Sequence, residues 1–198
     1  MENSIRKVAL GLVLTVTLAG SQSALADQTL VFVRHGEKPD NDSGQLTCKG
    51  LNRALALPDV LMERYGKPEA IFAAGPKEKK SGSSLRSLTT MTPTAIRLSL
   101  PINIQYHADD IQGLQTALLS DSYQNSVVFV AWEHKNLVKV VKNIVKTEGG
   151  NLDEIPPWPG NDFDSVFVLT LNRRATSNKV IFTHQQEHLN DVSAVCNK

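Results

Sequence analysis

The sequence predicts an α/β protein, built as a three-layer α/β/α sandwich around a central, mostly parallel sheet. Two observations support this fold class. Short runs of apolar and β-branched residues, which are typical of buried strands, recur at 29–33, 70–74 and 126–132. A segment with the helical spacing of apolar residues follows each run, and strands that alternate with helices favour a parallel sheet.

The elements expected along the chain follow from these patterns and from the positions of proline. A strand over 29–33 precedes a helix over 47–65, which Pro58 is expected to kink or divide because proline lacks the amide proton. The middle of the chain is expected to hold a strand over 70–74, a flexible loop over 75–84, a helix over 86–100 interrupted by Pro93, a strand over 102–106, a helix over 110–119 and the strand over 126–132. The last part is expected to hold a helix starting near His134, a proline-rich loop over 155–160 and a hairpin of strands over 166–171 and 179–183.

The first 26 residues have the pattern of a secretory signal peptide. Arg6 and Lys7 precede an uncharged apolar run over 8–20, and Ala24 and Ala26 form the small-x-small pattern of a cleavage site. The apolar run is shorter than the roughly 20 residues that span a bilayer. We therefore expect a signal peptide over 1–26, cleavage after Ala26, one domain over 27–198 and a periplasmic or secreted location. A retained N-terminal anchor is the alternative.

The charge balance bears on the partners of the protein. The full chain has 21 basic and 20 acidic residues, and the part after residue 26 has 19 of each. A neutral domain argues against a broad nucleic-acid footprint, although a small local anion site remains compatible with it. No later apolar segment is long enough to span a membrane. The oligomeric state is not indicated by any pattern.

Two cysteines, Cys48 and Cys196, are present. Because export would place the chain in an oxidising compartment, these cysteines are expected to pair. Such a bridge would tie the C-terminal tail to the region after the first strand. Two independent buried thiols are the alternative.

Histidines follow two of the predicted parallel strands. His35 comes directly after the first strand, between Arg34 and Gly36, and His134 follows the strand over 126–132. The carboxyl ends of parallel strands meet at one edge of a sheet, where α/β proteins bind ligands. Arg34 and Arg86, the latter at a predicted helix start, would add the positive charge that a phosphate group requires. The pattern therefore indicates a phosphate site.

The run over 31–37, which contains Arg34, His35 and Gly36, resembles the signature of the histidine phosphatase superfamily. Further segments resemble that family in the same order: Leu46–Ala54, Ser84–Thr90 and Val127–His134. The resemblance implies that His35 is the phosphorylated nucleophile and that Arg34, Arg86 and His134 hold the phosphoryl group. It also implies Asn41 as a further substrate contact, and hydrolysis of a small phosphorylated substrate without a metal or another cofactor.

The proton donor of the reaction is left open by the sequence. The mutase and acid-phosphatase branches of the family usually have Gly or Asp after the second histidine, whereas Lys135 follows His134 here and Glu133 precedes it. We favour Glu133 as the donor. Asp110, in the Asp109–Asp110 pair after the second arginine, and Glu37 are the other candidates.

Three other hypotheses stand beside a phosphomonoesterase. One is a phosphohistidine-protein or polyphosphate-type phosphatase with the same chemistry, and another is a catalytically inactive module that binds phosphorylated sugar or lipopolysaccharide. The third is a zinc hydrolase, because residues 184–188 match the pattern H-x-x-E-H. That pattern requires a helix, and here it follows a predicted strand. Arg53 is expected to be a structural salt-bridge partner.

Overall fold

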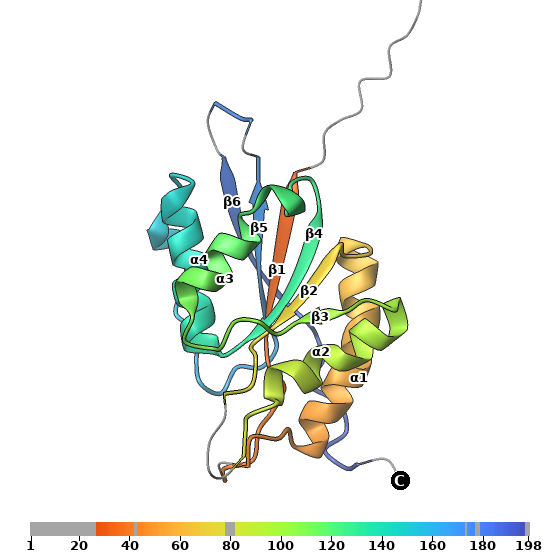
Figure 1. Cartoon of the computed structure of the whole chain (residues 1–198). Coiled ribbons are helices and arrows are strands. Elements are labelled where there is room, and N and C mark those ends of the chain that lie inside the picture. Colours follow the sequence, from red (N-terminus) through yellow and green to blue (C-terminus); the bar gives the residue numbers. More distant parts are fainter. Residues whose placement is uncertain (1–26, 42, 78–81, 173, 177–178, 197–198) are drawn as a thin grey trace, which may run out of the picture.

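The computed structural model describes residues 27–41, 43–77, 82–172, 174–176 and 179–196. The predicted signal peptide therefore lies outside the described residues. A six-stranded sheet forms the centre, in the order β3-β2-β4-β1-β5-β6 (Figure 1). The strands are β1 (Gln28–Arg34), β2 (Ala70–Ala73), β3 (Ile102–Asn103), β4 (Val127–Trp132), β5 (Ser165–Leu171) and β6 (Val180–Gln186). The first four are mutually parallel, and β5 and β6 are antiparallel additions beside β1.

Four α-helices cover the two faces of this sheet. They are α1 (Cys48–Tyr65), α2 (Arg86–Leu98), α3 (Ile111–Leu118) and α4 (His134–Thr147), with short 3-10 turns η1 (Asp121–Tyr123) and η2 (Leu152–Glu154). Helices α1 and α2 lie on one face, and α3 and α4 on the other (Figure 1). The predicted three-layer α/β/α sandwich is confirmed.

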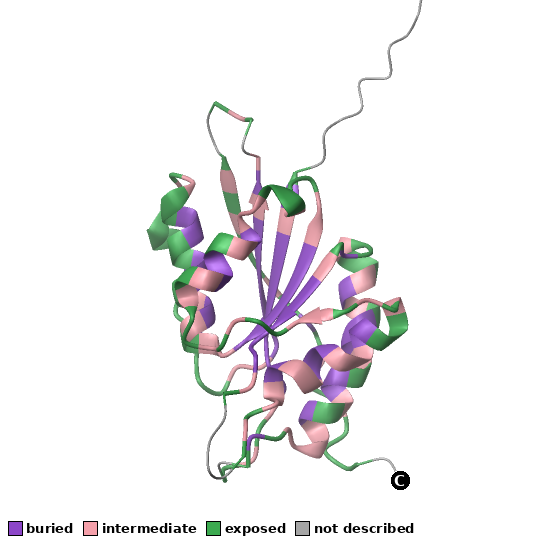
Figure 2. Cartoon of the chain, viewed as in Figure 1, coloured by how far each residue is buried: buried purple, intermediate pink, exposed green. Residues whose placement is uncertain are grey.

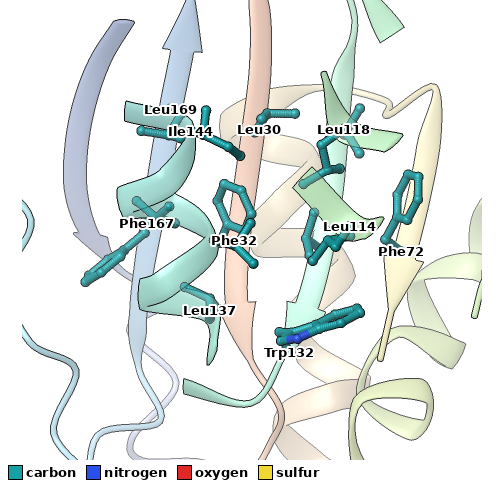
Figure 3. Packing of buried hydrophobic residues seen from close by; sticks show 14 of the residues in the cluster. Leu30, Phe32, Phe72, Leu114, Leu118, Trp132, Leu137, Ile144, Phe167 and Leu169 are labelled. Carbon is teal, nitrogen blue, oxygen red and sulfur yellow. The ribbon is translucent and has the colours of Figure 1, made fainter. Parts of the chain in front are cut away.

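The core is divided between the two faces according to the period-two alternation of the strands. Leu30 and Phe32 of β1 pack toward α3 and α4, while Val31 and Val33 pack toward α1 and α2. Figure 3 shows the first cluster, in which Trp132 of β4 also lies. The central strands are buried along most of their length, and exposure increases toward the outer helix faces (Figure 2). Burial on both faces explains why these strands read as unbroken apolar runs.

The predicted interruption at Pro93 is wrong, and Pro58 does not divide its helix. Helix α1 continues through Pro58, and α2 continues through Pro93. Leu57 and Leu61 on either side of Pro58 are fully buried in the core. Packing of an apolar helix face contributes more than one missing backbone hydrogen bond removes, so the tertiary context overrides the local signal.

Two strand predictions also change in length. The strand expected over 102–106 is only Ile102–Asn103, because the Asn103 side chain accepts a hydrogen bond from the Gln105 amide and turns the chain. At the other edge, β6 runs to Gln186 instead of ending near residue 183. His184 therefore lies within a strand.

The predicted cysteine pairing is confirmed. Cys48 and Cys196 form a disulfide with a Cα–Cα distance of 4.8 Å, which fastens the C-terminal tail to the first residue of α1. Asn52 of α1 also donates to the carbonyl groups of Ser193 and Val195. Among the described helices, none has the length and apolarity that crossing a membrane requires.

Candidate active site

The carboxyl ends of β1, β2 and β4 meet at one edge of the sheet and open into a cleft of about 230 Å³. His35 follows β1, Gly75 follows β2 and Glu133 follows β4, and all three line the cleft. Arg86, the first residue of α2, lines it as well. The structure thus brings together three of the five residues predicted to act in catalysis.

His35 is 5% exposed, and a single hydrogen bond fixes its ring. Its Nδ1 lies 2.8 Å from the carbonyl oxygen of Gly36. A carbonyl can only accept, so Nδ1 carries the proton and Nε2 of the neutral ring keeps its lone pair. Burial lowers the pKa of His35 to about 4, and the charges of Arg34 and Arg86 act in the same direction, against the Gly36 hydrogen bond. The ring is therefore a neutral potential nucleophile at physiological pH.

The backbone after His35 is tied to both helices of its face. The Gly36 amide donates to Thr90 Oγ1 (3.0 Å), and the Thr90 hydroxyl donates to the Arg86 carbonyl oxygen (2.8 Å). A side chain at Gly36 would place its Cβ 2.8 Å from the Gly50 carbonyl oxygen of α1. Glycine is required at this position because α1 and the backbone after β1 approach each other so closely.

Arg86 and Lys77 are the basic residues of the described cleft lining. The Arg86 guanidinium has no hydrogen bond or salt bridge to any described residue, and its Nε is buried without a partner. The first amide groups of α2 lie beside it, and the Leu85 side chain does not cap them. An unpaired guanidinium at a helix N-terminus is a suitable site for an anion.

Arg34 does not belong to the described cleft lining. Its NH1 group donates to the carbonyl oxygens of Gly160 (2.8 Å) and Asp162 (2.7 Å), with Pro159 at 3.4 Å. The guanidinium carbon lies 3.8 Å from the centroid of the Phe163 ring. The segment over residues 159–163, called the strap below, therefore holds Arg34. A direct contact of Arg34 with substrate stays a prediction.

Glu133 and His134 mark the transition from β4 to α4. Glu133 caps the helix by accepting from the amides of Lys135 (3.1 Å) and Asn136 (3.0 Å). Its Oε1 lies 2.7 Å from His134 Nδ1, although the two atoms lack hydrogen-bond geometry. Burial and the nearby Arg34 lower the pKa of His134. His134 does not belong to the described cleft lining.

The structure separates the other candidate proton donors. The Asp110 carboxylate caps α3 by accepting from the Gly113 amide (2.9 Å), and the Glu37 carboxylate is paired with Arg53. Asp109, the neighbour of Asp110, lines the cleft instead and pairs with Lys77 at 2.9 Å. The Lys77 hydrogen bond lowers the pKa of Asp109. Asp110 does not belong to the described cleft lining, so its position gives no support to a role as proton donor.

Asn41 is not brought to the cleft. It is exposed, and its Oδ1 accepts from the Ser43 amide at 3.3 Å, in a local turn. Its proposed substrate contact has no support from its position, because Asn41 does not belong to the described cleft lining.

Arg53 is a structural residue, as predicted. Its side chain is fully buried and donates to Glu37, Asp164 and Glu187, which come from three separate parts of the chain. Its carboxylate partners raise the pKa of Arg53, although burial alone would lower it. This cluster joins the backbone after His35 to the start of β5 and to the segment after β6.

The zinc hypothesis does not fit the positions of residues 184–188. His184 lies in β6 with Nε2 2.7 Å from Ser165 Oγ, and Glu187 is bound to Arg53. The motif requires both histidines on one helix face, which a strand cannot provide. The described residues contain no group of three His, Cys, Asp or Glu side chains arranged to hold a metal ion.

No protein-family profile and no curated protein sequence matches this chain. Solved structures do match it. SixA, a protein histidine phosphatase in complex with tungstate, superposes with a TM-score of 0.57 at 17% identity, over 80% of this chain and 97% of that chain. The phosphoglycerate mutase of Plasmodium falciparum gives a TM-score of 0.53 at 10% identity, over 82% and 92%. A mycobacterial glucosyl-3-phosphoglycerate phosphatase gives 0.51 at 12% identity, over 80% and 97%.

These similarities assign the fold. The chain has the histidine phosphatase fold, which phosphatases and phosphoglycerate mutases share. The resemblance that the run over 31–37 indicated is thereby confirmed at the level of the fold.

Proposed function

We propose that this protein is a metal-independent phosphomonoester hydrolase that acts through a phosphohistidine intermediate on His35. The observation that carries the proposal is the state of His35: a neutral ring, held by the Gly36 carbonyl oxygen, that lines the same cleft as the unpaired Arg86. SixA and the mycobacterial enzyme, which share this fold, are phosphatases, and this supports the assignment.

The reaction has two steps. In the first, His35 Nε2 attacks phosphorus, an N–P bond forms, and the ester oxygen leaves with a proton from a carboxylic acid. In the second, a water oxygen attacks phosphorus, its proton returns to the carboxylate, and the N–P bond breaks to release phosphate. Arg86 and the first amides of α2 stabilise the charge on the phosphoryl oxygens.

Glu133 is our proposed proton donor, because it lines the cleft together with His35. Asp109 is the second candidate for the same reason, and its pairing with Lys77 favours the ionised form. Neither carboxyl group is buried, so we expect good leaving groups to be hydrolysed fastest. Glu133→Gln and Asp109→Asn distinguish the two candidate donors when both variants are assayed with aryl and alkyl phosphates. An alkyl leaving group depends more on protonation, so the variant that lacks the true donor should lose more rate on the alkyl ester.

A cleft of about 230 Å³ fits a phosphoryl group and a small leaving group.

The signal-peptide pattern over 1–26 supports a periplasmic or secreted location. The binding-module alternative would use the same Arg86 site without turnover.

The test is turnover of p-nitrophenyl phosphate by residues 27–198 with a chelator present. We expect His35→Ala to abolish turnover, and His107→Ala, the control at an exposed histidine, to retain it. The acidic limb of kcat/KM should lie near pH 4, where His35 becomes protonated. Turnover that survives in His35→Ala, or that the chelator removes, would contradict the proposal. Vanadate binding without turnover would favour the binding module.

A further inference from the structure

The strap over residues 159–163 has no role in the proposed mechanism, but hydrogen bonds hold it in place. The Asp162 carboxylate accepts from the amides of Asp164 (2.9 Å) and Ser165 (3.1 Å), and the Asp162 carbonyl oxygen accepts from Trp158 Nε1 (3.0 Å). Trp158 is itself buried, with its ring centroid 4.5 Å from that of Phe167. The strap is thus fastened to the core at both ends, and Phe163 is carried at a fixed place.

Phe163 contacts two residues of the site at once. Its ring centroid lies 3.8 Å below the guanidinium carbon of Arg34 and 6.3 Å from the centroid of the His35 ring, tilted by 51°. Both distances lie within the ranges of cation–π and aromatic pairs. Phe163 is the aromatic residue that the structure places against His35.

We propose that Phe163 is a positioning residue for phosphoryl transfer, whose ring holds the Arg34 guanidinium on one face and covers one side of the His35 imidazole. This inference rests on the proposed function for its kinetic consequence. The strap carbonyl groups fix the NH1 group of Arg34, and the Phe163 ring fixes the plane of the guanidinium.

The charged groups around His35 are distributed over several elements. Arg34 ends β1, Arg86 begins α2 and Glu133 precedes α4, and Lys77 and Asp109 line the same cleft farther out. Without the Phe163 ring, water reaches the His35 imidazole, and the Arg34 guanidinium is no longer fixed beside it. Burial and the Arg34 charge both lower the pKa of His35, so weakening either one favours its protonation.

The experiment compares Phe163→Met, which replaces the ring by a flexible chain that covers the His35 imidazole less completely, with Phe163→Tyr, which keeps the aromatic face. Phe182→Met on β6, whose ring packs edge-on against Phe167, is the matched control. Three quantities are measured: the pH titration of the His35 ring by NMR, the pH profile of kcat/KM for p-nitrophenyl phosphate, and the melting temperature. The NMR titration does not depend on turnover.

In Phe163→Met we expect the His35 titration to move upward from its value of about 4, toward 6.5. The acidic limb of kcat/KM should move with it, and kcat/KM at neutral pH should fall about tenfold, the loss expected for a partly desolvated cation–π contact. Phe163→Tyr should restore both readouts, and Phe182→Met should leave both unchanged.

A His35 titration that is the same in Phe163→Met and in the wild type would overturn the inference. So would a shift that Phe163→Tyr fails to correct while both variants melt like the wild type. If Phe163→Met does not fold, Phe163→Leu takes its place in the same comparison. Absence of turnover in the wild type would refute the proposed function alone, because the His35 titration still decides the role of Phe163.

Discussion

Replacing Arg53 by alanine tests whether the buried charge cluster holds the domain together. The substitution removes the guanidinium that joins Glu37, Asp164 and Glu187, and the side chains of Asp164 and Glu187 are 3% and 0% exposed. Water cannot take the place of the lost partner without opening the core. The substitution leaves the Asp164 carboxylate buried without its ion-pair partner, and breaking such a pair costs about 3 to 5 kcal/mol of the free energy of unfolding.

Urea denaturation with the disulfide intact measures this loss of free energy. Thermal denaturation measures it as a change in melting temperature: in a domain of this size about 1 kcal/mol corresponds to roughly 2 to 4 °C, so the melting temperature should fall by on the order of 10 °C. The control is Arg97→Ala, which removes an exposed salt bridge to Asp59 and should cost less than about 1 kcal/mol. An Arg53→Ala loss no larger than that of Arg97→Ala would refute the reasoning.

Two further predictions concern the pH dependence of stability and the disulfide. Burial raises the pKa of Glu187 to about 8, above its value in an unfolded chain. Its contribution to the free energy of unfolding is therefore complete at low pH and is lost as the pH rises through about 8. The wild type should therefore lose stability relative to Glu187→Gln between about pH 5 and pH 9 in urea titrations, and parallel curves would contradict this. The disulfide closes a loop with a sequence separation of 148 residues. Cys196→Ser should lower the free energy of unfolding by up to about 4 to 5 kcal/mol, and an added reductant should then change only the wild type.

The sequence predicted the site where the signal was local. His35, Arg86 and Glu133 each follow or begin an element with a clear pattern, and the parallel topology brings them to one cleft. The mostly parallel sheet was also predicted, because strands that alternate with helices favour it.

Features that depend on distant residues could not be predicted from local patterns. The Arg34 guanidinium is held by strap carbonyl groups that lie 125 to 128 residues away, which no local pattern encodes. Helix α1 continues through Pro58 because the adjacent Leu57 is buried in the core. The pattern of two adjacent aspartates also does not distinguish Asp109, which lines the cleft, from Asp110, which caps α3.

Strand β1 places the start of the described chain and the cleft at opposite ends of the sheet. Gln28 begins the strand and His35 follows its last residue, so the point where the described chain starts lies about 23 Å from His35, the proposed nucleophile, at the opposite end of the strand (Figure 1). The C-terminal tail is fastened instead at the start of α1, near the end of the sheet that carries the cleft. A surface, dye or carrier coupled ahead of Asp27 would therefore present the cleft outward to substrate, whereas coupling at the tail would crowd its entrance.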